Sequence, residues 1–211
     1  MPPRLAALAL LTLLAAAPAG AQDDPGAWTT AAARGAFDLC REDAPDAARV
    51  AEHGEVWGWP RFAGYVEHPI GFKREAGGES VRSIGSADKP ASVELGVQSG
   101  VVTSAAPVLV RYFRCNVASN LDIRTDLVAY FTDAYGPPAS RSDATVVWEQ
   151  RKAPAGAPQG QSGGDVEADL VKTIAASLPG TKVTRVELTR ERGVTRARLS
   201  WFENAGPAPA P

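Results

Sequence analysis

Four segments of the chain space their apolar residues at the intervals that place them on one side of an α-helix. The first has Asp24 as its capping residue and Pro25 at its first helical position. The third is capped by Ser119 or Asn120 and ends at Gly136. We therefore expect four helices, over residues 24–43, 45–54, 119–135 and 165–178.

Five further segments alternate apolar and polar residues, which is the pattern of a strand with one buried face. They cover residues 91–99, 107–118, 143–151, 182–189 and 194–201. In the second of them Phe113, Cys115 and Val117 share one face, but Arg111 falls on that face too. Residues 55–89 follow no regular pattern and predict a loop-rich region with one or two short strands.

Alternating strands favour an antiparallel or mixed sheet, because the strands of a parallel sheet are usually apolar throughout. The expected fold class is therefore α+β, with a sheet of about five strands and helices packed on one face. The last two strands are expected to form a hairpin. A four-residue turn ending at Gly193 would place Val186 opposite Ala197 and Glu187 opposite Arg196.

Residues 1–21 have the parts of a secretory signal peptide: a positive charge at Arg4, an apolar run over residues 5–18, and small residues at Ala19 and Ala21. Because that run is too short to span a bilayer comfortably, we expect cleavage after Ala21 rather than retention as an anchor. Residues 22–203 are expected to form one α+β domain with a flexible linker at about residues 152–164. A disordered Pro/Ala tail is expected over residues 204–211, and the location is periplasmic or secreted.

Charge argues against two classes of partner. The 211 residues include 22 Lys and Arg and 24 Asp and Glu, for a net charge of −2. Because neither sign forms a block, there is no electrostatic basis for binding nucleic acid or an anionic membrane. No segment after the leader approaches about 18 consecutive apolar residues, so no membrane span is expected after cleavage.

Cys40 and Cys115 are the only cysteines. An even number of cysteines in an exported protein predicts a disulfide. It would close a loop of about 76 residues and stabilise the fold by roughly 4 kcal/mol in the chain-entropy model. Two buried free thiols are the alternative, and a metal site is disfavoured because neither His53 nor His68 has zinc-site spacing. We expect no metal and no cofactor.

Ser162 lies in GQSGG, which fits the G-x-S-x-G pattern of a serine nucleophile. The hydrolase version needs a strand directly before the serine and a histidine after it, and the chain has neither. The chymotrypsin-like version needs an aspartate where Gln161 stands. We interpret Ser162 as part of a Gly- and Ser-containing linker, and no catalytic residue is predicted.

The segment WGWPRFAGY is the strongest candidate for a binding surface. Aromatic rings beside a cation can form a surface for a ligand or partner. The candidate ligand- or partner-binding residues are Trp57, Trp59, Arg61, Phe62 and Tyr65. The alternative is that the tryptophans fill the core.

The chain contains three short features together. They are F-x-x-C at Phe37 to Cys40, the pair Gly58-Trp59, and a strand carrying Cys115 that leads into a helix. With them the chain resembles a group of small exported proteins of unknown function from Gram-negative bacteria. The resemblance covers most of the chain after the leader. It implies a disulfide-tied periplasmic α+β domain and carries over no activity and no functional residue.

These observations lead to a functional hypothesis with two alternatives. The first is a non-enzymatic binding or envelope-interaction module whose partner is an unknown envelope protein or a small ligand. The second is a hydrolase whose active site shows no sequence motif. The third is a structural component of the envelope.

Overall fold

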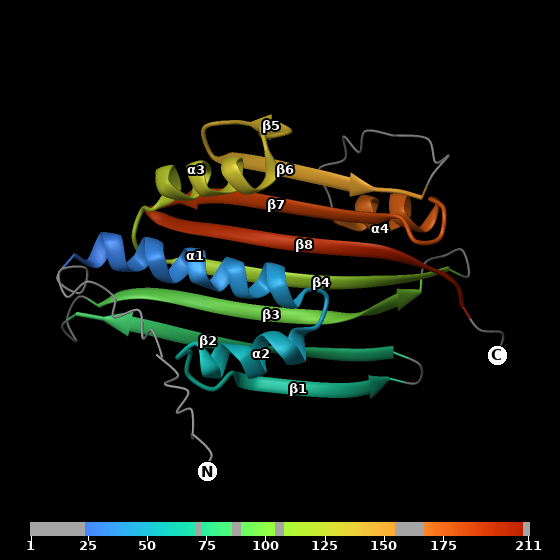
Figure 1. The fold of residues 1–211 in the computed structure, drawn as a ribbon, viewed down its shortest axis with the longest axis horizontal. Helices are drawn as coiled ribbons and strands as arrows, with labels where there is room; N and C mark the ends of the chain where they lie inside the picture. Colours follow the sequence, from blue (N-terminus) through green and yellow to red (C-terminus); the bar gives the residue numbers. More distant parts are fainter. Residues whose placement is uncertain (1–23, 71–72, 86–89, 104–107, 155–166, 209–211) are drawn as a thin grey trace, which may run out of the picture.

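A computed structural model describes residues 24–70, 73–85, 90–103, 108–154 and 167–208, without the side chains of residues 64–70, 73–76, 103 and 167–169. Within them the chain forms four helices and one antiparallel sheet (Figure 1). The helices are α1 (Pro25–Asp43), α2 (Ala47–Val56), α3 (Arg124–Tyr135) and α4 (Glu167–Ala175). The strands are β1 (Ala63–Ile70), β2 (Lys73–Ile84), β3 (Ala91–Thr103), β4 (Val108–Ser119), β5 (Ser140–Arg141), β6 (Thr145–Lys152), β7 (Lys182–Glu191) and β8 (Val194–Pro207).

The sheet contains eight strands in the order β1-β2-β3-β4-β8-β7-β6-β5. The α+β class and the antiparallel arrangement agree with the sequence analysis, but the number of strands was underestimated. The two additional long strands, β1 and β2, come from the segment that was read as loop-rich. Their sequences include Gly64, Gly77 and Gly78, and glycine is depleted in strands, which hid the pattern.

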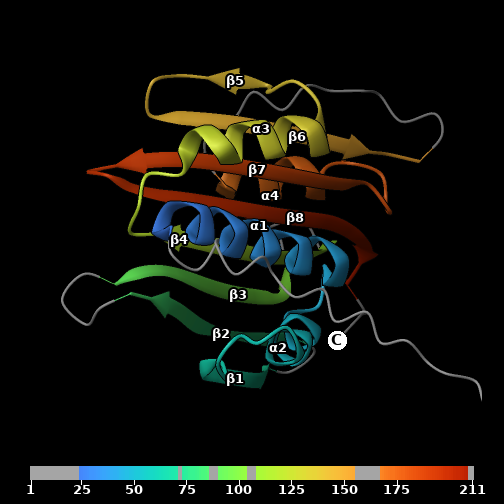
Figure 2. The same ribbon diagram turned by 60° about the vertical axis from the view of Figure 1, so that its left-hand side comes forward.

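Three helices cover one face of the sheet. Figure 2 shows α1, α2 and α3 in front of the strands. Side chains of these helices share one core with the inward residues of the sheet, and Phe37, Leu127 and Phe131 are among its largest members. The sheet contributes alternate residues to this core, such as Phe113, Cys115 and Val117 of β4, as the strand period requires.

The fourth helix packs on the opposite face. Leu170 and Ile174 of α4 form a separate core with Tyr112 of β4, Val183 of β7 and Phe202 of β8. These strand residues alternate along the strands with those beneath α1 and α3, so their side chains point to the opposite face of the sheet. The expectation that the helices share one face therefore describes α1–α3 and not α4. Periodicity identifies an apolar helix stripe but not the sheet face that it meets.

The β7–β8 hairpin forms with a different register from the predicted one. Glu191 pairs with Val194, so the turn consists of Arg192 and Gly193 alone. Both have positive φ, at 51° and 83°, as a two-residue hairpin turn of this kind requires. Glu187 therefore pairs with Arg198 rather than Arg196. The shift is two residues, which leaves every side chain on the face that was predicted.

Several helix boundaries differ from the predictions, which also began the second helix at residue 45 and ended the fourth at residue 178. The third helix begins at Arg124 after Ile123, with no side-chain cap, rather than at Ser119 or Asn120. The second continues through Gly54 to Val56. A side chain at position 54 would approach the Phe62 ring, with a Cβ only 3.0 Å from its Cε2 atom. Gly54 therefore serves packing inside the helix rather than its termination.

The predicted disulfide joins Cys40 of α1 to Cys115 of β4, with both cysteines fully buried. It ties the longest helix to a central strand of the sheet. The structure also resolves the position of Arg111, which shares the face of Cys115. Arg111 is exposed and its guanidinium lies 3.7 Å from the carboxylate of Glu203, its cross-strand partner on β8.

The end of β8 includes residues that the sequence analysis assigned to a disordered tail. Asn204 is buried, and its side-chain amide donates hydrogen bonds to the carbonyl oxygens of Ile174 (3.1 Å) and Ser177 (2.8 Å). Its Oδ1 accepts from the backbone N–H of Gly206 at 2.8 Å. Asn204 thus satisfies carbonyls at the end of α4, which have no partner within the helix.

Replacing Asn204 by alanine is expected to lower the free energy of unfolding by about 2 kcal/mol, because the Ser177 carbonyl and the buried Gly206 N–H lose their hydrogen-bond partner. Urea denaturation followed by circular dichroism measures this change. The exposed neighbour Ala205 provides the control, since Ala205→Ser should change the stability by less than about 0.5 kcal/mol. Equal free energies of unfolding for the two variants would show that the contacts of residues 204–207 do not stabilise α4.

Candidate functional site

The aromatic segment predicted as a binding surface is divided between core and surface. Trp59 and Phe62 are buried, and the Arg82 guanidinium lies 5.5 Å from the centroid of the Trp59 ring. Trp57 is 46% exposed and Arg61 is exposed. The side chain of Tyr65 lies outside the described residues. Two of the five predicted residues thus fill the core, and a binding role for this segment stays a prediction.

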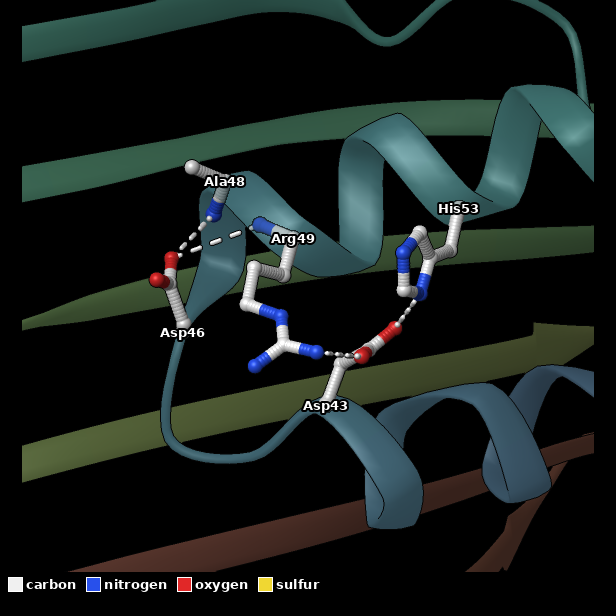
Figure 3. Close-up of polar contacts among 5 residues, drawn as sticks. All are labelled: Asp43, Asp46, Ala48, Arg49 and His53. Atoms are coloured by element: carbon white, nitrogen blue, oxygen red, sulfur yellow. Dashed lines mark hydrogen bonds and ion pairs between the residues drawn. The ribbon is translucent and has the colours of Figure 1, made fainter.

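Of Ser162, His53 and His68, which were considered as a nucleophile or metal ligands, only His53 has a described side chain. Ser162 lies outside the described residues, as does the side chain of His68. His53 lies on α2 with its Nδ1 atom 2.8 Å from Asp43 Oδ2, and Figure 3 shows Arg49 directed at the same carboxylate, at 3.7 Å. Asp43 is buried at the end of α1. Within the described ranges, no serine, threonine or cysteine side chain hydrogen-bonds to His53.

The Asp43 cluster explains how the first two helices are joined. Next to it, Asp46 caps α2 by accepting from the backbone N–H groups of Ala48 (2.9 Å) and Arg49 (3.3 Å), also drawn in Figure 3. Asp46 therefore caps the start of α2, and Asp43 contacts the side chains of Arg49 in its first turn and His53 in its second. These are contacts that fix the corner between α1 and α2.

A second polar cluster joins α1 to α3. The Tyr130 hydroxyl donates to Asp38 Oδ1 at 2.7 Å, and Arg41 binds the same oxygen at 2.8 Å. Burial, followed by the hydrogen bond to Asp38, raises the pKa of Tyr130 far above its usual range. Tyr130 is therefore a neutral hydrogen-bond donor at physiological pH, which suits a fixed helix contact.

A groove of about 490 Å³ lies on the sheet face opposite α1–α3, in the part that α4 leaves open. Strands β2, β3, β4, β8 and β7 form it. Its lining combines acidic, basic and small residues: Glu79, Glu94, Asn116, Val117, Ala118, Glu187, Thr189, Arg196, Ala197 and Arg198.

The unpaired acidic side chains and the basic side chains of the groove come from different strands. Glu79 of β2 and Glu94 of β3 stand at one end, and neither carboxylate has an ion-pair or hydrogen-bond partner among the described residues. Arg196 and Arg198 of β8 stand towards the other end, where Glu187 of β7 also lines the groove as the cross-strand partner of Arg198 and lies 3.7 Å from the Arg185 guanidinium. The Nε of Arg198 donates to Asn116 Oδ1 at 2.9 Å, which fixes the direction of its guanidinium.

Small residues separate these charges. Two rows of paired residues cross the sheet here: Glu94, Ala118 and Arg196 form one, and Glu79, Gly96, Asn116 and Arg198 form the other. Gly96 and Ala118 have little or no side chain to stand above the sheet. The carboxylates therefore do not reach the guanidinium groups, and the hollow between them remains open.

Sequence reasoning missed this groove because its residues come from strands separated by more than one hundred positions. Glu94, Asn116, Arg196 and Arg198 were the polar positions of correctly predicted strands. Such positions are usually assigned to solvent, and only the order of the strands brings them together. The alternation of apolar and polar residues was the available signal for these positions. It does not show which strands lie next to each other in the sheet.

Among the described residues, no group of three or more His, Cys, Asp or Glu side chains is placed to hold a metal ion. The same part of the chain contains no helix with the length and apolar character needed to cross a membrane. Comparison of the chain with protein-family models, with curated proteins and with solved structures finds no match.

Proposed function

We propose that this protein is an exported, non-enzymatic binding module that holds a small charged ligand in the groove of its open sheet face. The observation that carries the proposal is the placement of unpaired carboxylates opposite oriented guanidinium groups, with an uncharged hollow between them. Carboxylates that lack partners within a protein are available for a ligand cation, and nearby guanidinium groups of opposite charge select for the orientation of the ligand.

Export is supported by two observations. The leader-like residues 1–21 have the composition of a signal peptide. The Cys40–Cys115 disulfide fits an oxidising compartment, such as the periplasm or the extracellular space. The resemblance to small exported proteins of Gram-negative bacteria points to the same compartments and stays a prediction.

Filling the groove tests the proposed function. A Cβ at Gly96 would lie 3.5 Å from the Glu79 Cγ atom, which is ordinary contact, so Gly96→Val should fold normally and block the hollow. Thermal unfolding is measured with 10 mM glycine, putrescine, succinate or trialanine. At least one compound should raise the Tm of the natural protein by about 3 °C through mass action, and none should raise that of the variant.

A matched variant separates the groove from the predicted aromatic surface. Trp57→Ala removes the half-exposed ring on the other side of the sheet and should leave the ligand response unchanged. Loss of the response in Trp57→Ala, with retention in Gly96→Val, would assign binding to the aromatic segment instead. Chemical turnover of the bound compound would support the hydrolase alternative.

A further inference from the structure

We propose that the ligand of the groove is a peptide of three or four residues with both termini free. This inference rests on the proposed function, because it identifies the ligand class of the same site. The separation of the charges, the chemistry of the acidic and basic groups and the neutral centre of the groove support this ligand class.

The separation follows from the strand register. Glu94 and Arg196 are two strands apart, and Glu79 and Arg198 are three strands apart. Neighbouring strands are about 4.8 Å apart, so the backbone positions of the two pairs are about 10 and 14 Å apart. The Arg198 side chain leans towards β4, where its Nε contacts Asn116, so its guanidinium lies closer to the carboxylates than its backbone does. An extended peptide spans about 3.3–3.6 Å per residue, so three or four residues bridge these distances.

The acidic end suits an ammonium group. Glu79 and Glu94 occupy adjacent strands at diagonal positions, because Glu79 pairs with Gly96 and Glu94 with Val81. Two neighbouring carboxylates without a protein cation repel each other, and a ligand cation between them relieves that repulsion. A peptide amino terminus has a pKa of about 7.7–8.0 and is mostly protonated at pH 7.

The basic end suits a carboxylate. Arginine binds carboxylates through parallel N–H groups, and this geometry depends on a fixed guanidinium plane. The Asn116 contact orients Arg198, and Arg196 lies two positions away on the same face of β8. The only carboxylate within ion-pair distance of Arg196 among the described residues is Glu191, at 3.9 Å on the exposed hairpin.

The centre of the groove is uncharged. Gly96 and Ala118 carry no polar side-chain atoms, and the Asn116 side chain can hydrogen-bond with a peptide group. A diamine satisfies the acidic end alone and a dicarboxylate the basic end alone. A zwitterion with neutral amide groups in between matches both the Glu79 and Glu94 pair and the Arg196 and Arg198 pair, while Glu187 is within 3.7 Å of the Arg185 guanidinium.

Calorimetric titration of the purified protein with trialanine, N-acetyl-trialanine and trialanine amide tests this inference. Blocking either terminus should weaken binding by at least about fivefold, because each removes one charge-assisted contact. Putrescine and succinate should bind more weakly than trialanine. Equal binding of the free and blocked peptides, or tighter binding of putrescine or succinate, would overturn the peptide assignment.

Isosteric variants assign each terminus to its end of the groove. Glu79→Gln with Glu94→Gln should abolish the preference for a free amino terminus, and Arg198→Gln should abolish the preference for a free carboxylate. Glu52→Gln on α2 and Arg141→Gln on β5 remove the same charges from exposed positions elsewhere and should keep both preferences.

The experiments distinguish failure of the peptide inference from failure of the groove as the binding site. If a diamine or dicarboxylate binds best and Gly96→Val blocks it, the groove is the binding site and the peptide inference fails. If trialanine binds equally to Gly96→Val and to the natural protein, both proposals fail.

Discussion

Loss of the Cys40–Cys115 disulfide is expected to lower the free energy of unfolding by about 4 kcal/mol. The bridge joins residues 75 positions apart, and both cysteines are fully buried between α1 and the sheet. Without it the unfolded chain gains the freedom of a long open loop. For a domain of this size the midpoint of thermal unfolding should fall by roughly 10 °C.

Guanidinium denaturation of Cys40→Ala, Cys115→Ala and the double variant measures this effect. Because each single variant already breaks the bridge, the double variant should lose little more, and the two single effects should not add. Chemical reduction of the natural protein provides a control that keeps both sulfur atoms in place. A loss below about 1 kcal/mol in all three variants would mean that the unfolded chain is already constrained in another way.

Truncation of Phe131 to alanine is expected to cost about 3–5 kcal/mol. Phe131 of α3 is fully buried, with its ring centroid 4.8 Å from that of Phe37 on α1 and 5.2 Å from that of Trp148 on β6. It therefore joins two helices to the sheet at one point. The variant would leave a cavity that all three elements border, and rigid secondary structure collapses only partly into such a space.

The same denaturation experiment tests this prediction with two controls. Phe131→Leu retains most of the volume and should lose clearly less than the alanine variant. Val56→Ala removes an apolar side chain that is 80% exposed and should change stability by less than about 0.5 kcal/mol. If Phe131→Ala resembles Val56→Ala, the aromatic contacts contribute little to the fold.

The fold shows where sequence patterns are informative. The cap at Asp24, the end of α3 at Gly136 and the strand character of residues 182–189 depend on neighbouring residues, and the structure confirms them. The hairpin pattern was correct for the faces but wrong by two residues in register. Alternation has a period of two, so the two registers bury the same side chains, and the conformations of Arg192 and Gly193 select between them.

Other features depend on contacts between distant segments. Asn204 looked like the start of a polar tail because its partners, the carbonyls at the end of α4, lie about 30 positions away. Arg111 conflicted with its apolar neighbours until Glu203 was known to face it across β4 and β8. In both cases a polar side chain is explained by a partner that no local pattern identifies.

By itself, the sequence determined the α+β class, the inward residues of most strands and the pairing of two cysteines, because these follow from spacing, composition and local capping. Tertiary structure alone decided the strand order, the face on which α4 packs, and the groove between Glu79, Glu94, Arg196 and Arg198. Hydrogen bonding between strands can join segments from any two parts of the chain. Side chains that meet across a sheet therefore share a site without sharing a pattern.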